Sequence, residues 1–128
     1  INGNRHDYDE SDIITFAEGL IGLPRIRRAV VVSMSGLEPF CWLAPLDVDA
    51  TKFVVVEPIR VFDGYRPETY YPAADGAETL AIVTIASDWT RTTINLRAPI
   101  FIDKETRRGT QRILSESPYH FAEVLPQQ

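Results

Sequence analysis

The stretch TTINLRAPIFID, residues 92–103, decides the fold class because its apolar side chains recur at every second position. The even positions 94–102 are all apolar, and asparagine, arginine and aspartate stand between or after them. A period of two predicts a strand with one packed face and one face towards solvent. Pro99 cannot donate a hydrogen bond to a neighbouring strand. We therefore expect a bend, a bulge or a sheet edge there, with residues 97–99 conspicuous at the surface.

Similar short apolar runs, rich in Val, Ile, Thr and aromatic residues, lie on both sides of this stretch and are separated by turn residues. We expect strands at residues 12–17, 29–34, 40–46, 52–57, 79–86, 92–103 with an interruption, and 109–114. The run Phe53–Val56 is apolar on both faces before Pro58, which predicts a central, covered strand. Seven segments predict an all-β sandwich or barrel. The main helical candidate is 117–125, which could equally be a docked tail.

Size and composition predict one folded unit. The chain has 128 residues, of which 45% are apolar and 24% charged, so we expect a single domain over residues 1–128 with 1–11 as a flexible start. The net charge of -5 disfavours nucleic acid and anionic membranes as direct partners and favours a basic or neutral partner. No apolar run approaches the roughly 20 residues of a membrane span, and the first residues lack an export signal. A cytoplasmic location fits these features.

Residues for catalysis are scarce. The single cysteine, Cys41, lies in an apolar string and is interpreted as a small buried residue. The two histidines, His6 and His120, lie near opposite ends of the chain, and the phosphate-binding, dinucleotide-binding and zinc motifs are missing. We therefore expect no cofactor, no metal and no enzymatic activity. A hydrolase stays open as an alternative that requires a deep pocket holding His120 or Cys41.

Charge is distributed unevenly along the chain. Residues 1–90 contain 14 acidic and 7 basic side chains, whereas residues 91–112 contain 2 acidic and 6 basic ones. Both groups can be ordinary solvated surface, or they can form two electrostatically distinct surfaces for two partners. The candidate electrostatic face at the start of the chain consists of Asp7, Asp9, Glu10 and Asp12.

The basic stretch also supports a different function, a small β-barrel that binds RNA or another single strand. Such a module would combine its positive charges with two aromatic side chains that stack on bases, Trp89 and Phe101. The positive charges would come from Arg91, Arg97, Lys104, Arg107, Arg108 and Arg112. The net charge of -5 argues against this alternative.

Five short segments taken in order are similar to one known family. They are 19–24 (GLIGLP), 39–43 (PFCWL), 53–58 (FVVVEP), 95–100 (NLRAPI) and 106–109 (TRRG), the last together with Gln111, Ile113 and Leu114. With this order and spacing, the chain from about residue 12 to 119 resembles the FliW flagellar assembly factor family. Two segments depart from the common pattern of that family. GLIGL stands in place of GLPGF, and Leu43-Ala44-Pro45 stands in place of LQS.

The resemblance implies a small single-domain antiparallel β-barrel-like fold with little helix, in a cytoplasmic protein that binds other proteins and catalyses nothing. Members of the family bind flagellin before its export. In many bacteria they also bind CsrA, an RNA-binding translational repressor. The implied mechanism is a partner switch: once flagellin leaves the cell, the freed protein binds CsrA and relieves its repression of the flagellin messenger.

The candidate partner-binding residues are Asn95, Arg97, Ala98 and Pro99, together with the loop residues Gly19 and Gly22. We expect the bend at 98–99 to offer an open strand edge, to which an extended segment of flagellin could add. The two glycines are expected to need unusual backbone angles. The structural alternatives are that Asn95 caps a turn, Arg97 pairs with a carboxylate and Gly22 merely turns the chain.

Overall fold

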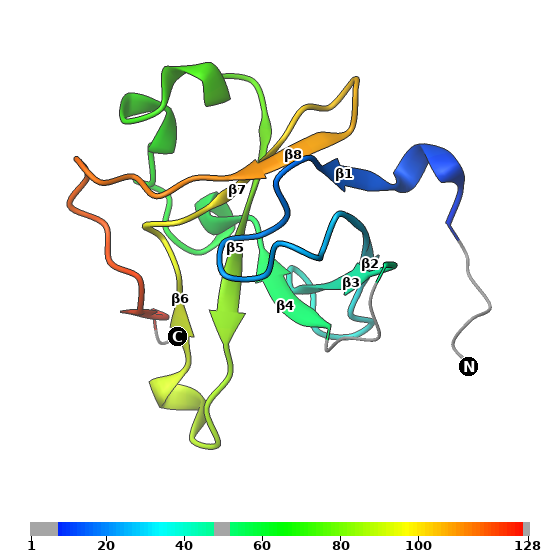
Figure 1. Cartoon of the computed structure of the whole chain (residues 1–128). Coiled ribbons are helices and arrows are strands. Elements are labelled where there is room, and N and C mark those ends of the chain that lie inside the picture. Colours follow the sequence, from blue (N-terminus) through cyan, green and yellow to red (C-terminus); the bar gives the residue numbers. More distant parts are fainter. Residues whose placement is uncertain (1–7, 48–51, 127–128) are drawn as a thin grey trace.

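The computed structural model describes residues 8–47 and 52–126, which form an all-β structure joined by single-turn helices (Figure 1). The strands are β1 (Ile14–Phe16), β2 (Arg28–Ser33), β3 (Cys41–Pro45), β4 (Phe53–Val56), β5 (Glu78–Thr84), β6 (Thr93–Ile94), β7 (Ile100–Ile102), β8 (Arg108–Gln111) and β9 (Glu123–Val124). The 3-10 helices are η1 (Glu10–Asp12), η2 (Pro58–Arg60), η3 (Pro67–Thr69), η4 (Pro72–Ala74) and η5 (Trp89–Arg91). The prediction of an all-β fold with little helix is confirmed. In the described residues there is no helix with the length and apolar character that crossing a membrane requires.

Seven strands close into a barrel in the order β4-β3-β2-β1-β8-β7-β5, because β5 also pairs with β4. The two ends of β5 have different neighbours: residues 78–80 pair with β7 and residues 81–83 pair with β4. The pairings are antiparallel except that β1 runs parallel to β8. The barrel-like fold is confirmed, with one parallel pair that the sequence did not reveal.

The long alternating stretch forms two strands instead of one. β6 pairs with the far end of β5, β7 pairs with its near end, and residues 95–99 loop out between them. This confirms the predicted interruption. The apolar even positions 94–102 are all buried, but Phe101 on the opposite face is buried as well, at 3% exposure.

Two main apolar clusters explain the sequence pattern. The barrel interior is filled by Ile14, Phe16, Leu20, Ile26, Ala29, Leu43, Val55, Leu80, Ile100 and Ile102. A second cluster lies outside the barrel wall and includes Val56, Tyr65, Ala81, Val83, Ile94, Leu96 and Leu125. β4 lies between β3 and β5, and its Val55 and Val56 are fully buried in different clusters. The prediction of a central strand is therefore confirmed.

The helical candidate at 117–125 is wrong, and its alternative as a docked tail is correct. The segment returns along the barrel and ends in β9, which pairs with β6 (Figure 1). Its peptide groups bond to the barrel: the His120 carbonyl accepts from the backbone N–H groups of Leu96 and Arg97, both at 3.1 Å. Leu125 then inserts into the outer cluster. Contacts with the barrel thus replace the internal bonds of a helix.

Candidate partner-binding surface

The loop 95–99 is built by its own polar residues. The backbone N–H of Asn95 donates to the carbonyl of Ile82 at 2.9 Å, and its side-chain Oδ1 accepts from the N–H of Ala98 at 3.0 Å. Asn95 therefore caps this turn, which is the structural role that the sequence analysis offered as an alternative to partner binding. The loop is consequently fixed to β5 at its first residue and closed by a hydrogen bond within itself.

Arg97 fastens the C-terminal segment to this loop. Its guanidinium donates to the carbonyl oxygens of Ser115 at 2.7 Å, Tyr119 at 3.0 Å and Ser117 at 3.3 Å. It also lies 5.6 Å from the ring of Phe121, a cation–π distance. Arg97 thus donates hydrogen bonds to three backbone carbonyls, whereas its structural alternative was an ion pair with a carboxylate. Its charge is directed into the molecule, although the side chain remains partly exposed.

The expected open strand edge at 98–99 is wrong, as is the expectation that residues 97–99 stand out at the surface. The carbonyl of Ala98 accepts from Gln111, and that of Pro99 accepts from the backbone N–H of Arg112 at 3.1 Å. Ala98 is 3% exposed and Pro99 is fully buried. The chain after β8 covers this edge, so any contribution of Ala98 and Pro99 to binding has to be indirect.

The loop 19–24, which we call the glycine loop, has the backbone geometry that was expected. Gly19 and Gly22 have φ angles of +71° and +79°, in the left-handed region that favours glycine. A Cβ at Gly19 would lie 2.5 Å from the carbonyl oxygen of Pro24, whereas one at Gly22 would meet nothing within 4 Å. Between them the chain reverses tightly, because Leu20 and Leu23 exchange backbone hydrogen bonds at 3.2 and 2.8 Å.

Gln111 brings the two predicted segments together. Its side-chain Oε1 accepts from the backbone N–H of Ile21 at 2.9 Å, and its Nε2 donates to the carbonyl of Ala98 at 3.0 Å. One amide therefore joins the glycine loop to the loop 95–99. Sequence reasoning did not select Gln111 as a binding-site residue, because its role depends on the donor and the acceptor that the fold places on either side of it.

Beside this amide lies a hollow of about 220 Å³ with apolar side chains near it. It is lined by Ala17, Glu18, Gly19, Leu20, Ile21, Gly109, Thr110, Gln111 and Arg112. Ile21 and Leu23 on the loop are 48% and 43% exposed, and Ile113, two residues beyond Gln111, is 48% exposed. We call these three residues and the hollow the glycine-loop surface. Of the three, Ile21 lines the hollow itself, and Leu23 and Ile113 belong to the two segments that border it. Exposed apolar side chains beside a hollow can bind an apolar side chain of another protein.

The acidic start and the basic turn lie beside each other in the structure. One hollow of about 600 Å³ is lined by Glu10 and Glu105 as well as by Arg28, Lys104 and Arg107. The guanidinium of Arg107 donates to the backbone carbonyl of Asp12 at 3.2 Å. Opposite charges thus meet around this hollow, and the basic side chains lie next to the acidic start.

The residues of the predicted electrostatic face have only partly been placed. Asp9, Glu10 and Asp12 are exposed on and beside η1, and Asp7 lies outside the described residues. The backbone N–H of Asp9 donates to the carboxylate of Asp12 at 2.9 Å, which fixes this turn.

The comparisons with known proteins agree with this architecture. The family model described as FliW protein matches residues 3–125, which is nearly the whole chain. The chain belongs to the FliW family. Relatives of this FliW-family chain include the flagellar assembly factor FliW of Clostridium botulinum (strain Alaska E43 / Type E3), 32% identical over 98% of this chain and 94% of that protein. Another is the flagellar assembly factor FliW of Ruminiclostridium cellulolyticum, 30% identical over 86% of this chain and 80% of that protein.

A solved structure supports the same assignment. The crystal structure of the flagellar assembly factor FliW superposes with a TM-score of 0.81 at 26% identity, covering 96% of this chain and 92% of that chain. The resemblance seen in the five sequence segments is thereby confirmed. This FliW-family chain is a flagellar assembly factor, and the name of its family describes assembly instead of a chemical reaction.

The nucleic-acid alternative loses part of its basis in this FliW-family fold. Phe101 is 3% exposed and packs against Tyr71 at 5.3 Å between ring centroids, so it cannot stack on a base. The guanidinium of Arg112 lies 5.0 Å from the ring of Tyr71, and Arg97 binds carbonyls as described above. Trp89 remains 47% exposed, in edge contact with Phe40.

The hydrolase alternative requires a pocket around Cys41 or His120. Four surface hollows of the described chain are lined by neither residue. Burial raises the pKa of the Cys41 thiol, which favours the less reactive neutral form. Within residues 8–47 and 52–126, no three His, Cys, Asp or Glu side chains gather in a way that could hold a metal ion.

Proposed function

We propose that this protein binds flagellin in the cytoplasm before export and, by partner switching, antagonises the translational repressor CsrA. The observation that carries the proposal is membership in the FliW family over nearly the full chain. In this scheme the protein acts through which partner it binds, flagellin or CsrA, and catalyses no reaction. While unexported flagellin holds it, CsrA remains free to repress the flagellin messenger.

Flagellin would bind at the glycine-loop surface. Ile21, Leu23 and Ile113 expose apolar area there that burial against a partner would remove from water. The six residues selected from the sequence would support this surface from below. Gly19 and Gly22 shape the loop, and Asn95, Arg97, Ala98 and Pro99 form the base to which Gln111 fastens it.

CsrA would respond to the negative charge of the protein. CsrA binds RNA through basic groups, so a partner of net charge -5 docked beside those groups would lower the affinity for phosphates. This influence extends over about 8 Å at physiological salt. Asp7, Asp9, Glu10 and Asp12 are the proposed electrostatic face. The neighbouring Arg28 and Arg107 limit its reach, so apolar contacts would have to supply much of the affinity.

The flagellin proposal is tested by calorimetric titration with purified flagellin from the same genome. Each of the two single variants, Ile21→Asp and Leu23→Asp, should weaken flagellin binding at least tenfold, because a carboxylate buried at the contact loses its hydration. Ile85→Asp is the matched control, since Ile85 is 49% exposed and lies outside the glycine-loop surface. Equal binding by all the variants would reject the surface. No binding by the unaltered protein would reject the function.

The CsrA proposal is tested by titration at several salt concentrations. We expect affinity to fall as salt rises without vanishing, because screening weakens the charged part and leaves the apolar part. Reversing Asp9 and Glu10 to lysine should flatten the salt dependence. Affinity that does not respond to salt would remove the electrostatic part of the proposal.

A further inference from the structure

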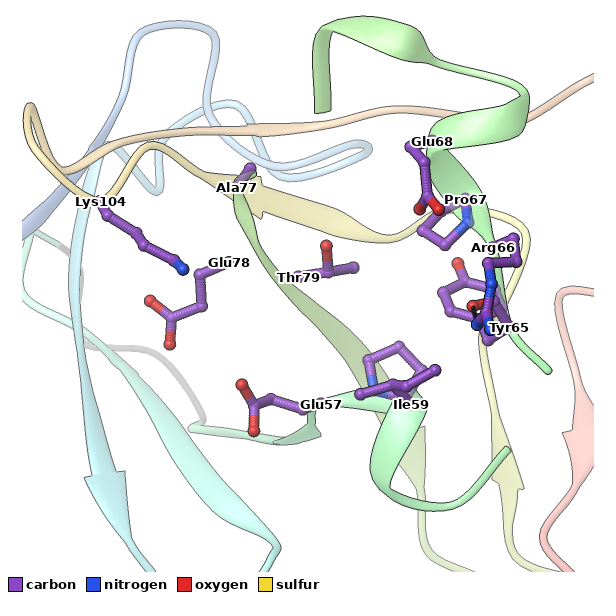
Figure 2. Close-up of a pocket in the computed structure, with 11 residues that line it drawn as sticks. Glu57, Ile59, Tyr65, Arg66, Pro67, Glu68, Ala77, Glu78, Thr79 and Lys104 are labelled. Carbon is purple, nitrogen blue, oxygen red and sulfur yellow. Dashed lines mark hydrogen bonds between the residues drawn. The ribbon is translucent and has the colours of Figure 1, made fainter. Parts of the chain in front are cut away.

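A groove of about 580 Å³ lies at the start of β5. It shares no lining residue with the hollow at the glycine loop. It is lined by Glu57, Pro58, Ile59, Tyr65, Arg66, Pro67, Glu68, Ala77, Glu78, Thr79 and Lys104. Figure 2 shows Glu57, Glu78 and Lys104 at one end and the side chains of 59, 65 and 67 at the other. Thr79, on β5, lies between the two ends (Figure 2).

The backbone of Thr79 is directed into this groove. The carbonyl of Ile82 accepts from Asn95, so the polar groups of Ile82 face β6. Because the direction of these groups alternates along a strand, those of Leu80 and Glu78 face the same side, towards β7. Thr79, Ala81 and Val83 must then direct their N–H and C=O groups towards β4.

The register of β7 leads to the same result. The carbonyl of Pro99 accepts from Arg112 on the β8 side, so alternation turns the polar groups of Ile100 towards β5. Ile100 is the partner of Leu80, which makes that pair the bonded one. Thr79, opposite Phe101, is the non-bonded position of this ladder.

β4 ends before it reaches Thr79. Val56 pairs with Ala81, so continued pairing would place Pro58 opposite Thr79. Pro58 has no N–H, and its carbonyl already accepts from Val61 at 3.0 Å and Phe62 at 2.8 Å. The turn η2 therefore leaves one position of the β5 edge without a partner strand. The opening is short, because the N–H of Ala77 is used by the carbonyl of Ala74 at 2.9 Å.

The side chains at the two ends of the groove select different chemistry. Among the described residues, the carboxylates of Glu57 and Glu78 form long ion pairs with Arg60 at 3.6 Å and Arg107 at 3.5 Å, and both carboxylates remain partly exposed. Such pairs contribute little and exchange readily for another cation. At the opposite end, Ile59 is 45% exposed, and Pro58 and Pro67 also line the groove. The groove thus offers two carboxylates beside Lys104 at one end, and apolar contact with Ile59 at the other, where Arg66 and Glu68 also line it.

We propose that this groove binds a short extended segment of another protein as an added strand centred on Thr79. The segment would exchange backbone hydrogen bonds with Thr79, place a lysine or arginine near Glu57 and Glu78, and place an apolar side chain against Ile59. Main-chain bonds would then supply affinity and the two ends would supply selectivity. This inference concerns a second site and does not rest on the flagellin or CsrA proposals.

The test uses two synthetic peptides and the full-length protein. The probe is Ac-Thr-Val-Thr-Lys-Val-Thr-NH2, and its control carries N-methyl groups at the two central peptide bonds. In two-dimensional NMR spectra we expect the Thr79 amide signal to shift with the first peptide and not with the second. We also expect the Thr79 amide to exchange with solvent faster than that of Leu80 in the free protein, and to become protected on binding.

Variants separate this site from general surface charge. Glu57→Lys should weaken the peptide at least fivefold, whereas Glu116→Lys, a reversal on an exposed residue outside the groove, should leave its affinity unchanged. A Thr79 amide that is already protected in the free protein would overturn the proposal. Equal binding of the N-methylated peptide, or the absence of any shift at Thr79, would also overturn it.

Discussion

The side-chain Nε2 of Gln111 lies 3.0 Å from the carbonyl oxygen of Ala98 and donates to it. The other end of the same amide accepts from Ile21 in the glycine loop. The shape of the proposed flagellin surface therefore depends on one side chain that no partner has to touch. This relationship separates residues that build the surface from residues that contact a partner.

The amide bridge is tested by Gln111→Leu, which keeps the approximate size and removes both hydrogen bonds. We expect the free energy of unfolding to fall by about 1–3 kcal/mol, because Ala98 loses a partner in a poorly hydrated position. Urea unfolding measures this change. Flagellin affinity should fall as well, since the loop loses its anchor. A variant with unchanged stability and unchanged affinity would contradict the bridging role.

The two loop glycines are expected to differ in their tolerance of a side chain. Gly22→Ala should cost about 1 kcal/mol, from its left-handed backbone alone. Gly19→Ala should cost at least twice as much, because its Cβ would also collide with the backbone of Pro24. Thermal and urea unfolding of the two variants give the order directly. A Gly19 variant as stable as the Gly22 variant would show that this loop is less rigid than described.

Arg97 is expected to hold the C-terminal segment in place. Arg97→Leu removes bonds to three carbonyls, so residues 115–126 should exchange backbone amides faster and be cut more readily by proteases. Hydrogen-exchange mass spectrometry measures this, with Arg25→Leu as a control on an exposed arginine. Equal protection of the segment in both variants would contradict the role. Pro99→Asp should unfold the protein, because Pro99 is fully buried.

Tyr65 should make stability depend on alkaline pH. Its hydroxyl donates to the carbonyl of Leu96 at 2.8 Å, and burial raises the pKa of this phenol above its ordinary value of 10.0. The unfolded chain therefore loses this proton at a lower pH than the folded one. Stability from this group is complete below about pH 10 and declines above it by about 1.4 kcal/mol per pH unit.

The variant Tyr65→Phe isolates this effect. Its stability should be lower at neutral pH, because the carbonyl of Leu96 loses its donor, and should decline less between pH 10 and 11. Urea unfolding at several pH values in that range compares the two proteins. Parallel declines in both proteins would show that Tyr65 is not the titrating group.

The sequence was most informative where a local pattern determines structure. The alternation around Ile94 and Ile102 and the apolar run of β4 predicted buried strands, and Pro99 predicted the interruption. These features depend on side-chain period and on a missing N–H, both of which are local. The positive φ angles of Gly19 and Gly22 were expected from the loop in the same way.

The sequence was least informative about long-range contacts. It placed an open edge at Ala98 and Pro99, because nothing local shows that the chain after β8 returns to cover them. The roles of Gln111 and the opening beside Thr79 also depend on segments far apart in the chain. Pro58 did carry a signal, since a proline that ends a central strand leaves its opposite position unpaired.

The central claim, that one protein is held by either flagellin or CsrA, is tested most directly by competition. A fluorescent RNA bound by CsrA is first released by adding this protein, and purified flagellin is then added in steps. The account predicts that about one equivalent of flagellin restores RNA binding by CsrA. If flagellin instead joins the complex and the RNA stays free, or if flagellin does not bind at all, the partner-switch account is contradicted.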